Sequence, residues 1–328
     1  MKAMLCKAYG PPESLVLGDI DPPICGKRGV RIDVHAAGVN FPDVLLIAGQ
    51  YQFKPPFPFA PGGEVAGRVL EVGPEVTRFQ VGDRVMAMIG WNGFAEQAVA
   101  PESACLLMPE GMDYETGAVF PTIYGTSYHA LVQRANLQPG EVLLVHGACG
   151  GVGTAAIGIG KKLGARIIAT GGDDAKLARI QEEFAIEHVV NYRTAGPLKD
   201  AVKKLTGGKG ADVIYDPVGG DVFEQSLRCI NWNGRLLVIG FASGQIPAAR
   251  ANLMLLKGSS VVGVFWGSFT AREPDRNQAN FQVMLDWYRA GELAPLISHR
   301  FPLARAGEAI QALIDRRVVG KAVVIVER

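Results

Sequence analysis

Residues 142–170 read VLLVHGACGGVGTAAIGIGKKLGARIIAT, and this stretch decides the fold of the chain. The run Val142–Val145 is apolar without helical spacing, which is typical of a strand buried on both faces. Beyond the glycines, Val152–Leu163 is small and apolar, with lysines only at its end, where a helix dipole favours cations. Gly164 is in the position of a glycine that ends a helix, and Arg166–Thr170 is expected to form a second buried strand. The stretch therefore predicts strand, glycine turn, helix and strand.

The glycines between the first strand and the helix predict an anion site. A helix N-terminus binds anions because its N–H groups and dipole carry partial positive charge, and absent side chains let a pyrophosphate come close. The alternative is a glycine-rich turn without a ligand, but the strand before and the helix after both agree with a dinucleotide site. The candidate residues of this turn are Cys149, Gly150, Gly151, Val152 and Gly153.

The whole-chain properties exclude several classes of protein. A length of 328 residues suggests two domains, and a formal net charge of +1 gives no sign of a nucleic-acid or anionic membrane partner. The start, MKAMLCKAYG, lacks the apolar core of a signal peptide, and no apolar run is long enough to cross a bilayer. The cysteines are odd in number, scattered and without a CxxC pair, so we expect no disulfide framework and a location in the reducing cytoplasm. They are Cys6, Cys25, Cys105, Cys149 and Cys229.

The pattern of expected secondary structure changes twice along the chain. Residues 1–122 contain short β-rich runs between Pro- and Gly-rich turns, which predicts a mostly antiparallel, barrel-like domain. Residues 123–266 alternate strand and helix, which predicts a parallel sheet covered by helices on both faces. Residues 267–328 are expected to return to the first domain. The second domain is then an insertion in the first, and the cleft between the two is the expected active site.

Individual elements follow from the same patterns. The strands expected in the first domain include Gly29–Ala36, Glu64–Val72 and Arg84–Met88. In the second we expect helices Lys176–Phe184, Leu198–Leu205 and Val222–Cys229, and strands His188–Asn191, Asp212–Asp216, Arg235–Gly240 and Ser260–Trp266. The tail is expected to form helices Asn277–Ala290 and Ala304–Arg316 and a last strand, Lys321–Val326.

Several segments, in order along nearly the whole chain, resemble the medium-chain dehydrogenase/reductase superfamily, and within it the zinc-independent quinone oxidoreductases. The resemblance implies a Rossmann doubly wound parallel sheet inserted into a GroES-like, mostly-β catalytic domain. It also implies a homodimer, for which the apolar edge strand 259–266 is the expected contact. The segments are AAGVNFPDVLLIAGQY at 36–51, PGGEVAGRVLEVG at 61–73, GDRV at 82–85, HGACGGVG at 146–153, NYR at 191–193, YDPVGG at 215–220 and GKAVV at 320–324.

The positions of the zinc ligands in the zinc-bearing branch carry other residues here. The first cysteine is replaced by Asn40 or a neighbour, the histidine segment reads Pro61–Glu64, and a later cysteine is Thr122. The loop of four structural cysteines is missing after Glu96. A catalytic zinc needs three protein ligands, and none of the five histidines matches a ligand position. We therefore expect no metal, and a Glu64 paired with a buried partner such as Arg68 or with a backbone donor.

Without a Lewis acid, the expected acceptor is one already activated by conjugation, a quinone or an α,β-unsaturated carbonyl (enone). Asn40 and Tyr51 lie in the matching catalytic-domain segments and are the candidate catalytic residues; Asn40 is also a candidate cofactor contact. For Asn40 the alternative is a side chain bonded to its own loop backbone, and for Tyr51 a packing aromatic.

The end of the second strand indicates which nicotinamide cofactor binds. An Asp or Glu that would accept from the ribose hydroxyls of NAD is absent, because the strand runs into Gly171 and Gly172. In the family, Lys176 and Tyr192 match residues that hold the 2′-phosphate, which a cation and a phenol suit. Asp173 is better explained as the N-cap of the next helix. The expected cofactor is NADPH, with Gly172, Lys176 and Tyr192 at its phosphate.

The resemblance implies the remaining cofactor contacts. These are Thr126, Gly240, Phe241, Ala242, Val264, Phe265, Trp266, Arg316 and Lys321. The expected function is NADPH-dependent hydride transfer to a small-molecule quinone or enone. Two alternatives stay open: an enoyl-thioester reductase, which uses the same chemistry, and a non-catalytic NADPH-binding protein.

Overall fold

The computed structural model describes residues 1–327, which divide into two compact units. The first unit consists of Met1–Thr122 together with the chain from Pro295 on, and the second is Ile123–Ala294. The second unit is thus inserted into the first in sequence. Within the described residues, no helix is both long and apolar enough to cross a membrane.

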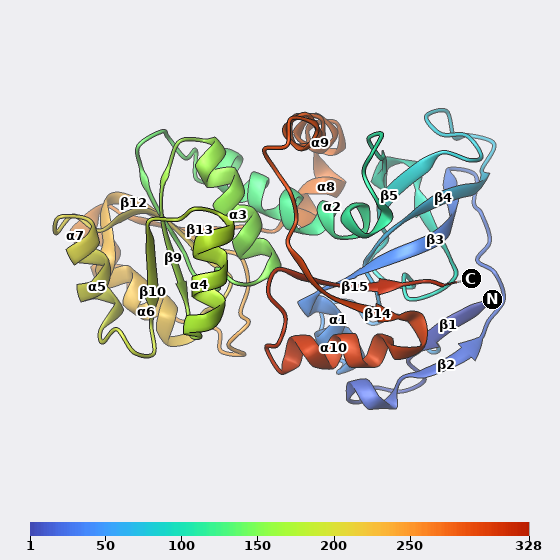
Figure 1. Ribbon diagram of the computed structural model, residues 1–328, viewed down its shortest axis with the longest axis horizontal. Helices are drawn as coiled ribbons and strands as arrows, with labels where there is room; N and C mark the ends of the chain where they lie inside the picture. Colours follow the sequence, from blue (N-terminus) through green and yellow to red (C-terminus); the bar gives the residue numbers. More distant parts are fainter. Residues whose placement is uncertain (328) are drawn as a thin grey trace. The chain divides into compact units, whose positions relative to one another are not determined.

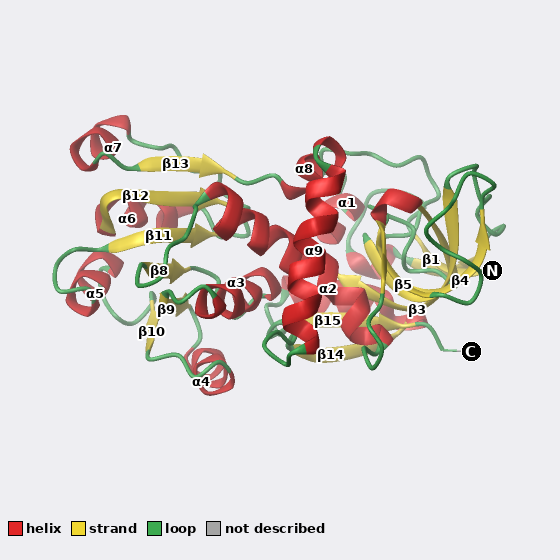
Figure 2. Ribbon diagram, turned by 90° about the horizontal axis from the view of Figure 1, so that it is seen from above, coloured by secondary structure: helices red, strands yellow, loops and turns green. Residues whose placement is uncertain are grey.

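The second unit is built on a six-stranded, wholly parallel sheet in the order β10-β9-β8-β11-β12-β13. Numbered along the chain this is 3-2-1-4-5-6, the order of the Rossmann fold, and Figure 2 shows the six strands in this sequence. The expected doubly wound sheet is confirmed. The strands are β8 (Val142–Val145), β9 (Arg166–Gly171), β10 (His188–Asn191), β11 (Ala211–Asp216), β12 (Ile230–Val238) and β13 (Ser260–Gly263).

Helices cover this sheet because each carries an apolar stripe that only the strands can bury. One set, α3 (Gly151–Lys162) and α4 (Asp174–Glu183), packs on β8, β9 and β10. The other set packs together over a core that includes Leu144, Ile214 and Leu236 from the strands. It consists of α5 (Leu198–Leu205), α6 (Gly220–Cys229) and α7 (Ala251–Lys257) (Figure 1).

The strand expected to reach Trp266 ends earlier, and the expected boundary at 266/267 differs from the observed division. β13 stops at Gly263, and Trp266 instead begins α8 (Trp266–Arg272), which α9 (Pro274–Arg289) follows. The Trp266 indole packs on Gly125, where an added Cβ would lie 2.3 Å from the ring. Its Nε1 donates to Asn277 Oδ1 at 3.0 Å. These contacts hold both helices on the second unit, so the return to the first unit comes after Ala294.

The first unit is mostly β, with a seven-stranded sheet in which β14-β15-β3-β4-β5-β7 are neighbours and β6 pairs with β3. All pairs are antiparallel except β14 with β15. The strands are β3 (Gly29–Val39), β4 (Glu64–Val72), β5 (Arg84–Met88), β6 (Gln97–Pro101), β7 (Cys105–Leu107), β14 (Ile297–Pro302) and β15 (Lys321–Ile325). A separate pair joins β1 (Lys2–Leu5) to β2 (Val16–Asp19).

Short helices complete the first unit. The helix α1 (Phe41–Ile47) follows β3 directly, and α10 (Ala306–Ile314) lies between β14 and β15 in the chain and packs on both. The helix α2 (Tyr114–Tyr128) contains the division at Thr122/Ile123 and continues into a π-helical segment, His129–Arg134. The candidate site residues of the second unit lie mainly in the loops after β8, β9, β10, β12 and β13, and those of the first unit lie mainly near the junction of β3, α1, β4 and β15.

Candidate functional site

The glycine turn of the second unit lies at the carboxyl end of β8. Gly147 adopts φ +55° and Gly150, the N-cap of α3, is extended at φ −87°. A Cβ on Gly153 would lie 2.5 Å from the Gly147 carbonyl oxygen, so the first turn of the helix sits directly against the loop. A Cβ on exposed Gly150 would meet only that same oxygen, at 3.4 Å. The first N–H groups of α3 are therefore open to an anion.

His146 lies buried beneath this turn, and sequence reasoning did not single it out. Its Nδ1 is 2.7 Å from Thr170 Oγ1, and its Nε2 is 2.7 Å from Ser226 Oγ. Ser226 donates its hydroxyl proton to the Val222 carbonyl, so it accepts from the imidazole, which fixes the tautomer with the proton on Nε2. Burial lowers the pKa of His146, so the ring is neutral. The neutral ring ties the ends of β8 and β9 to α6.

The Arg193 guanidinium and the Tyr192 phenol lie beside Gly172 at the carboxyl ends of β9 and β10. A Cβ on Gly172 would lie 2.9 Å from Arg193 Nε and 3.2 Å from the Tyr192 hydroxyl oxygen. Lys176 is on the first turn of α4, where the Asp173 carboxylate caps the helix by accepting from the Lys176 backbone N–H at 3.0 Å. The capping role expected for Asp173 is confirmed. Arg193 was not among the sequence candidates, although it ends the NYR segment quoted for the resemblance.

The other candidates in the second unit differ in exposure. Thr126 is half-buried on α2, and the next residue, Ser127, donates to the Val152 carbonyl at 3.0 Å, which joins α2 to the start of α3. Phe265 is 55% exposed, whereas Trp266 is buried in the α8–α9 packing. The indole of Trp266 is thus part of the core. The remaining candidates are half-buried or exposed loop residues after β12 and β13: Gly240, Phe241, Ala242 and Val264.

A buried polar network joins the candidates of the first unit. The Lys321 ammonium donates to three acceptors: Val39 O at 2.8 Å, Asn40 Oδ1 at 2.6 Å and Glu64 Oε1 at 3.0 Å. Asn40 Nδ2 donates to the same Glu64 oxygen at 2.8 Å, and the Thr122 N–H donates to the other Glu64 oxygen at 2.9 Å. Asn40 and Thr122 therefore both contact Glu64, and all three residues come from the segments that the resemblance compares with zinc-ligand positions.

Glu64 pairs with Lys321 and not with Arg68. The backbone donor expected for Glu64 is present in Thr122, but Arg68 donates to the Gly82 carbonyl instead. Room for the carboxylate comes from Gly38, where a Cβ would lie 2.4 Å from Glu64 Oε1. Both Glu64 and Lys321 are nearly inaccessible, at 0% and 3%. A buried ion pair of this kind persists only when its hydrogen bonds are satisfied, as they are here.

A second buried carboxylate, Asp43, organises the loop around Asn40. Its oxygens accept from the N–H groups of Asn40 at 2.7 Å and Gly62 at 2.8 Å. Burial raises the pKa of Asp43 to about 6, against the opposing effect of these two donors. Burial, and then the Asp43 charge, also raise the pKa of half-buried Tyr51. Tyr51 therefore lies near the network as a neutral phenol, with its ring 5.9 Å from that of Phe53.

The tail candidate Arg316 is exposed and adopts φ +56° just after α10. Lys321, by contrast, is buried at the start of β15. The two tail candidates are thus in different environments.

The residues at the junction of β3, α1 and β4 do not fit a zinc ion. Zinc takes three or four His, Cys or carboxylate ligands, and here a single carboxylate already accepts three N–H donors, one of them an ammonium. Residues 1–327 contain no cluster of three His, Cys, Asp or Glu side chains arranged to hold a metal.

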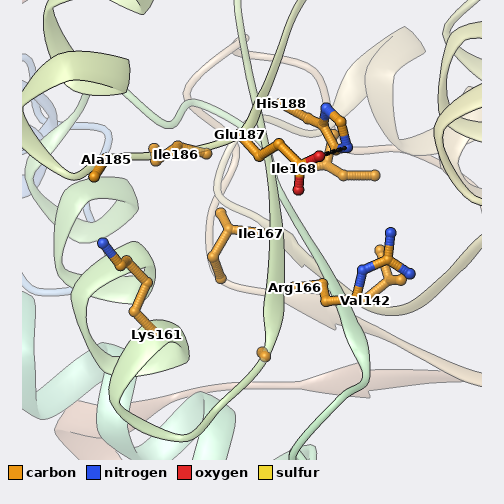
Figure 3. Close-up of a pocket in the computed structure, with 10 residues that line it drawn as sticks. Val142, Lys161, Arg166, Ile167, Ile168, Ala185, Ile186, Glu187 and His188 are labelled. Atoms are coloured by element: carbon orange, nitrogen blue, oxygen red, sulfur yellow. Dashed lines mark ion pairs between the residues drawn. The ribbon is translucent and has the colours of Figure 1, made fainter.

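A separate small cavity, of about 190 Å³, lies at the opposite end of the parallel sheet from the glycine turn. Figure 3 shows it at the amino ends of β8, β9 and β10, between Val142, Lys161, Ile167 and His188. In it, His188 Nε2 is 3.4 Å from Glu187 Oε1. Because ligands of such sheets bind beyond the carboxyl ends of the strands, this cavity is not part of the candidate nucleotide site.

Comparison with known proteins places both units in one family. Residues 26–110 match the model of the alcohol dehydrogenase GroES-like domain, and residues 151–288 match that of the zinc-binding dehydrogenases. The chain is 40% identical over 327 residues to a quinone oxidoreductase-like protein 2 homolog of Nematostella vectensis, covering 98% of this chain and 88% of the relative.

Solved structures agree with this assignment. A mycobacterial protein crystallised with NADPH is 30% identical, with a TM-score of 0.93 over 99% of this chain and 100% of that one. The Escherichia coli quinone oxidoreductase, crystallised with NADPH, is 26% identical, with the same TM-score over 99% and 100%. The chain belongs to the medium-chain dehydrogenase/reductase superfamily, in its quinone oxidoreductase-like branch.

Proposed function

We propose that the protein is an NADPH-dependent oxidoreductase that transfers hydride to quinones or other α,β-unsaturated carbonyls without zinc. The observation that carries the proposal is that one unit contains both an open glycine turn after β8 and basic side chains near the end of β9, the second strand of the sheet. The N-terminus of α3 is uncovered at Gly150, and Gly172 leaves room for the Tyr192 and Arg193 side chains. Relatives crystallised with NADPH support the same cofactor.

The second unit is assigned to the nucleotide. Its glycine turn, Cys149 to Gly153, holds the pyrophosphate through backbone N–H groups at the start of α3. Lys176, Tyr192 and Arg193 hold the 2′-phosphate, since a phosphate accepts well from cations and from a phenol. The open loops at Gly240–Ala242 and Val264–Phe265, with half-buried Thr126, are assigned to the ribose and nicotinamide.

The first unit is assigned to the acceptor. The bound nicotinamide supplies the hydride. The chain supplies orientation and hydrogen-bond donors: among the described residues, the Asn40 amide uses one Nδ2–H on Glu64 and keeps the second. Tyr51 adds a hydroxyl whose pKa is raised, so it is a donor at neutral pH. A neutral amide and a phenol are weaker electrophiles than a metal ion. They suit a substrate that delocalises the incoming charge onto a distant oxygen, as quinones and enones do.

The proposal includes a homodimer formed through β13. Among the described residues this strand pairs only with β12, so it leaves one edge of the sheet free at Ser260–Gly263. A free strand edge pairs readily with a second copy. Light scattering at micromolar concentration tests this, and a monomer would contradict it.

The test of function is NADPH consumption with a panel of quinones, enones and enoyl-CoA esters, repeated with NADH. The expected result is turnover of quinones or enones, faster with NADPH, in protein that metal analysis shows to be free of stoichiometric zinc. Turnover restricted to enoyl-CoA esters would replace the acceptor class by enoyl thioesters. Tight NADPH binding without turnover of any acceptor would instead support a binding protein.

A further inference from the structure

The buried ammonium of Lys321 has a role different from the cofactor contact expected from the sequence. Its nitrogen has three N–H donors, and three protein acceptors lie within 3.0 Å of it: Val39 O, Asn40 Oδ1 and Glu64 Oε1. The residue is 3% exposed. A phosphate would have to displace one of these acceptors and reach a buried group, so Lys321 is not available as a phosphate ligand.

The bonds that Lys321 makes determine which way the Asn40 amide faces. Asn40 Oδ1 accepts from the ammonium at 2.6 Å, and Nδ2 donates to Glu64 Oε1 at 2.8 Å. In the flipped amide, the NH2 group would face the ammonium and the carbonyl oxygen would face the carboxylate. Both contacts would then be repulsive, so the network allows one orientation.

Other hydrogen bonds of the network hold the groups that fix this orientation of the Asn40 amide, which we call the lock. Glu64 is held on its other oxygen by the Thr122 N–H at 2.9 Å, and the Asn40 backbone N–H is held by Asp43 at 2.7 Å. Glu64 and Asp43 are both buried. In the locked orientation the second Nδ2–H of half-buried Asn40 remains for a ligand.

We infer that Lys321 is a positioning residue: it orients the Asn40 amide as a donor to the bound nicotinamide nucleotide or acceptor, and does not itself touch either. This inference rests on the proposed function. It gives Lys321 a role in the first unit that differs from the phosphate-binding role proposed for Lys176 and Arg193 in the second unit.

The test is a double-mutant cycle between Lys321→Met and Asn40→Ala, measured as kcat/KM with both NADPH and NADH. A donor displaced by about 1 Å costs about a hundredfold in rate, so we expect Lys321→Met to lower kcat/KM by about ten- to a hundredfold with either cofactor. Because both residues act as one unit, adding Lys321→Met to Asn40→Ala should lower it by less than about threefold more. The NADPH-over-NADH ratio should stay within about threefold of wild type.

Two results overturn the inference. A tenfold or larger fall in the NADPH-over-NADH ratio on Lys321→Met would make Lys321 a phosphate ligand. Losses that multiply in the double variant would make its effect independent of Asn40.

Two further measurements protect the test from failures of folding or of the proposed activity. Lys321→Met leaves Glu64 buried and unpaired, so the neutral pair Glu64→Gln/Lys321→Met serves if the single variant does not fold. Wild-type kcat/KM in that pair would overturn the inference. If the wild type reduces no acceptor, the proposed function fails, and the cycle is read in the free protein by urea unfolding. Non-additive losses of stability for Lys321 and Asn40 then support the lock, and additive losses overturn it.

Discussion

Replacing Gly150 and Gly153 separately by Ala tests whether the glycine turn holds the cofactor or only shapes the fold. The two positions are three residues apart, yet their surroundings differ. A Cβ at Gly153 would lie 2.5 Å from Gly147 O and 2.8 Å from Ala148 Cα, both backbone atoms that have little room to move. A Cβ at Gly150 would meet only Gly147 O, at 3.4 Å, with φ −87° that any residue adopts.

The expected magnitudes follow from these distances. Overpacking costs about 1–3 kcal/mol, and Ala in a helix recovers about 0.5–1 kcal/mol relative to Gly. Because two backbone atoms lie closer than 3 Å, we expect the upper part of the net range, so Gly153→Ala should lower the free energy of unfolding by about 1–2.5 kcal/mol. Gly150→Ala should lower it by less than about 1 kcal/mol, the scale of a lost N-cap preference. Its methyl group would nevertheless stand where the pyrophosphate is proposed to rest, so the Kd for NADPH should rise at least about tenfold, or 1.4 kcal/mol.

The assay combines urea unfolding with NADPH titration by fluorescence. Gly158→Ala, on the same helix with its nearest contact at 3.4 Å from Leu293 Cδ2, is the control. It should leave the Kd for NADPH close to wild type and raise the free energy of unfolding by up to about 1 kcal/mol. A Gly150→Ala variant that is stable and binds NADPH as tightly as wild type would refute the placement of the pyrophosphate on this turn.

Three further predictions concern other parts of the second unit. Arg193→Ala should lower the NADPH-over-NADH ratio of kcat/KM by about tenfold through loss of a charged hydrogen bond. The control Arg179→Ala changes an exposed arginine of α4 and should leave this ratio unchanged. If the ratio in Arg193→Ala equals that of the wild type, Arg193 does not bind the 2′-phosphate. Because burial lowers the pKa of His146 in the folded chain, its neutral form stabilises the fold fully above about pH 6.5, and this contribution falls as the pH is lowered, by up to about 1.4 kcal/mol per unit. Urea unfolding from pH 8 to 5 should show that slope reduced in His146→Gln, and an unchanged slope would contradict the assignment. Trp266→Ala should cost about 3–5 kcal/mol of stability, because it opens a cavity in the core and leaves Asn277 Oδ1 without its donor; a loss confined to NADPH affinity would instead return Trp266 to the cofactor site.

The parts of the fold that the sequence predicted best are those with a clear stop near at least one end. β8, β10 and α5 begin and end at the predicted residues. Glu141 precedes β8, Glu187 precedes β10, and α5 lies between Pro197 and Gly207. The strand expected at Ser260–Trp266 was wrong at its end for the converse reason. The run VVGVFW is apolar throughout, and periodicity alone does not separate the end of a buried strand from the first turn of a buried helix. The Trp266–Asn277 bond that begins α8 is a tertiary contact.

The candidate site was predictable where its partners are close in sequence and unpredictable where they are not. Asp173 caps the helix that begins at the next residue by accepting from the N–H of Lys176, three residues away, and its role was recognised from local rules. Glu64 and Lys321 are 257 positions apart, and the sequence offered Arg68 as the nearer partner. His146 depends likewise on Thr170 and Ser226, from other elements.

Lys176 and Lys321 show why residue type and motif alone do not distinguish a lysine that binds a phosphate from one that orients a neighbouring amide. Both lysines were expected at the cofactor from the resemblance, Lys176 at the 2′-phosphate and Lys321 without a stated partner. Lys176 lies on the first turn of α4, partly exposed, where an ammonium suits a phosphate. Lys321 begins β15 with all three donors engaged inside the first unit. An ammonium so enclosed acts on a ligand only through the groups it holds. The difference between binding a charge and orienting an amide is therefore set by burial, which depends on how β3, β4 and β15 pair.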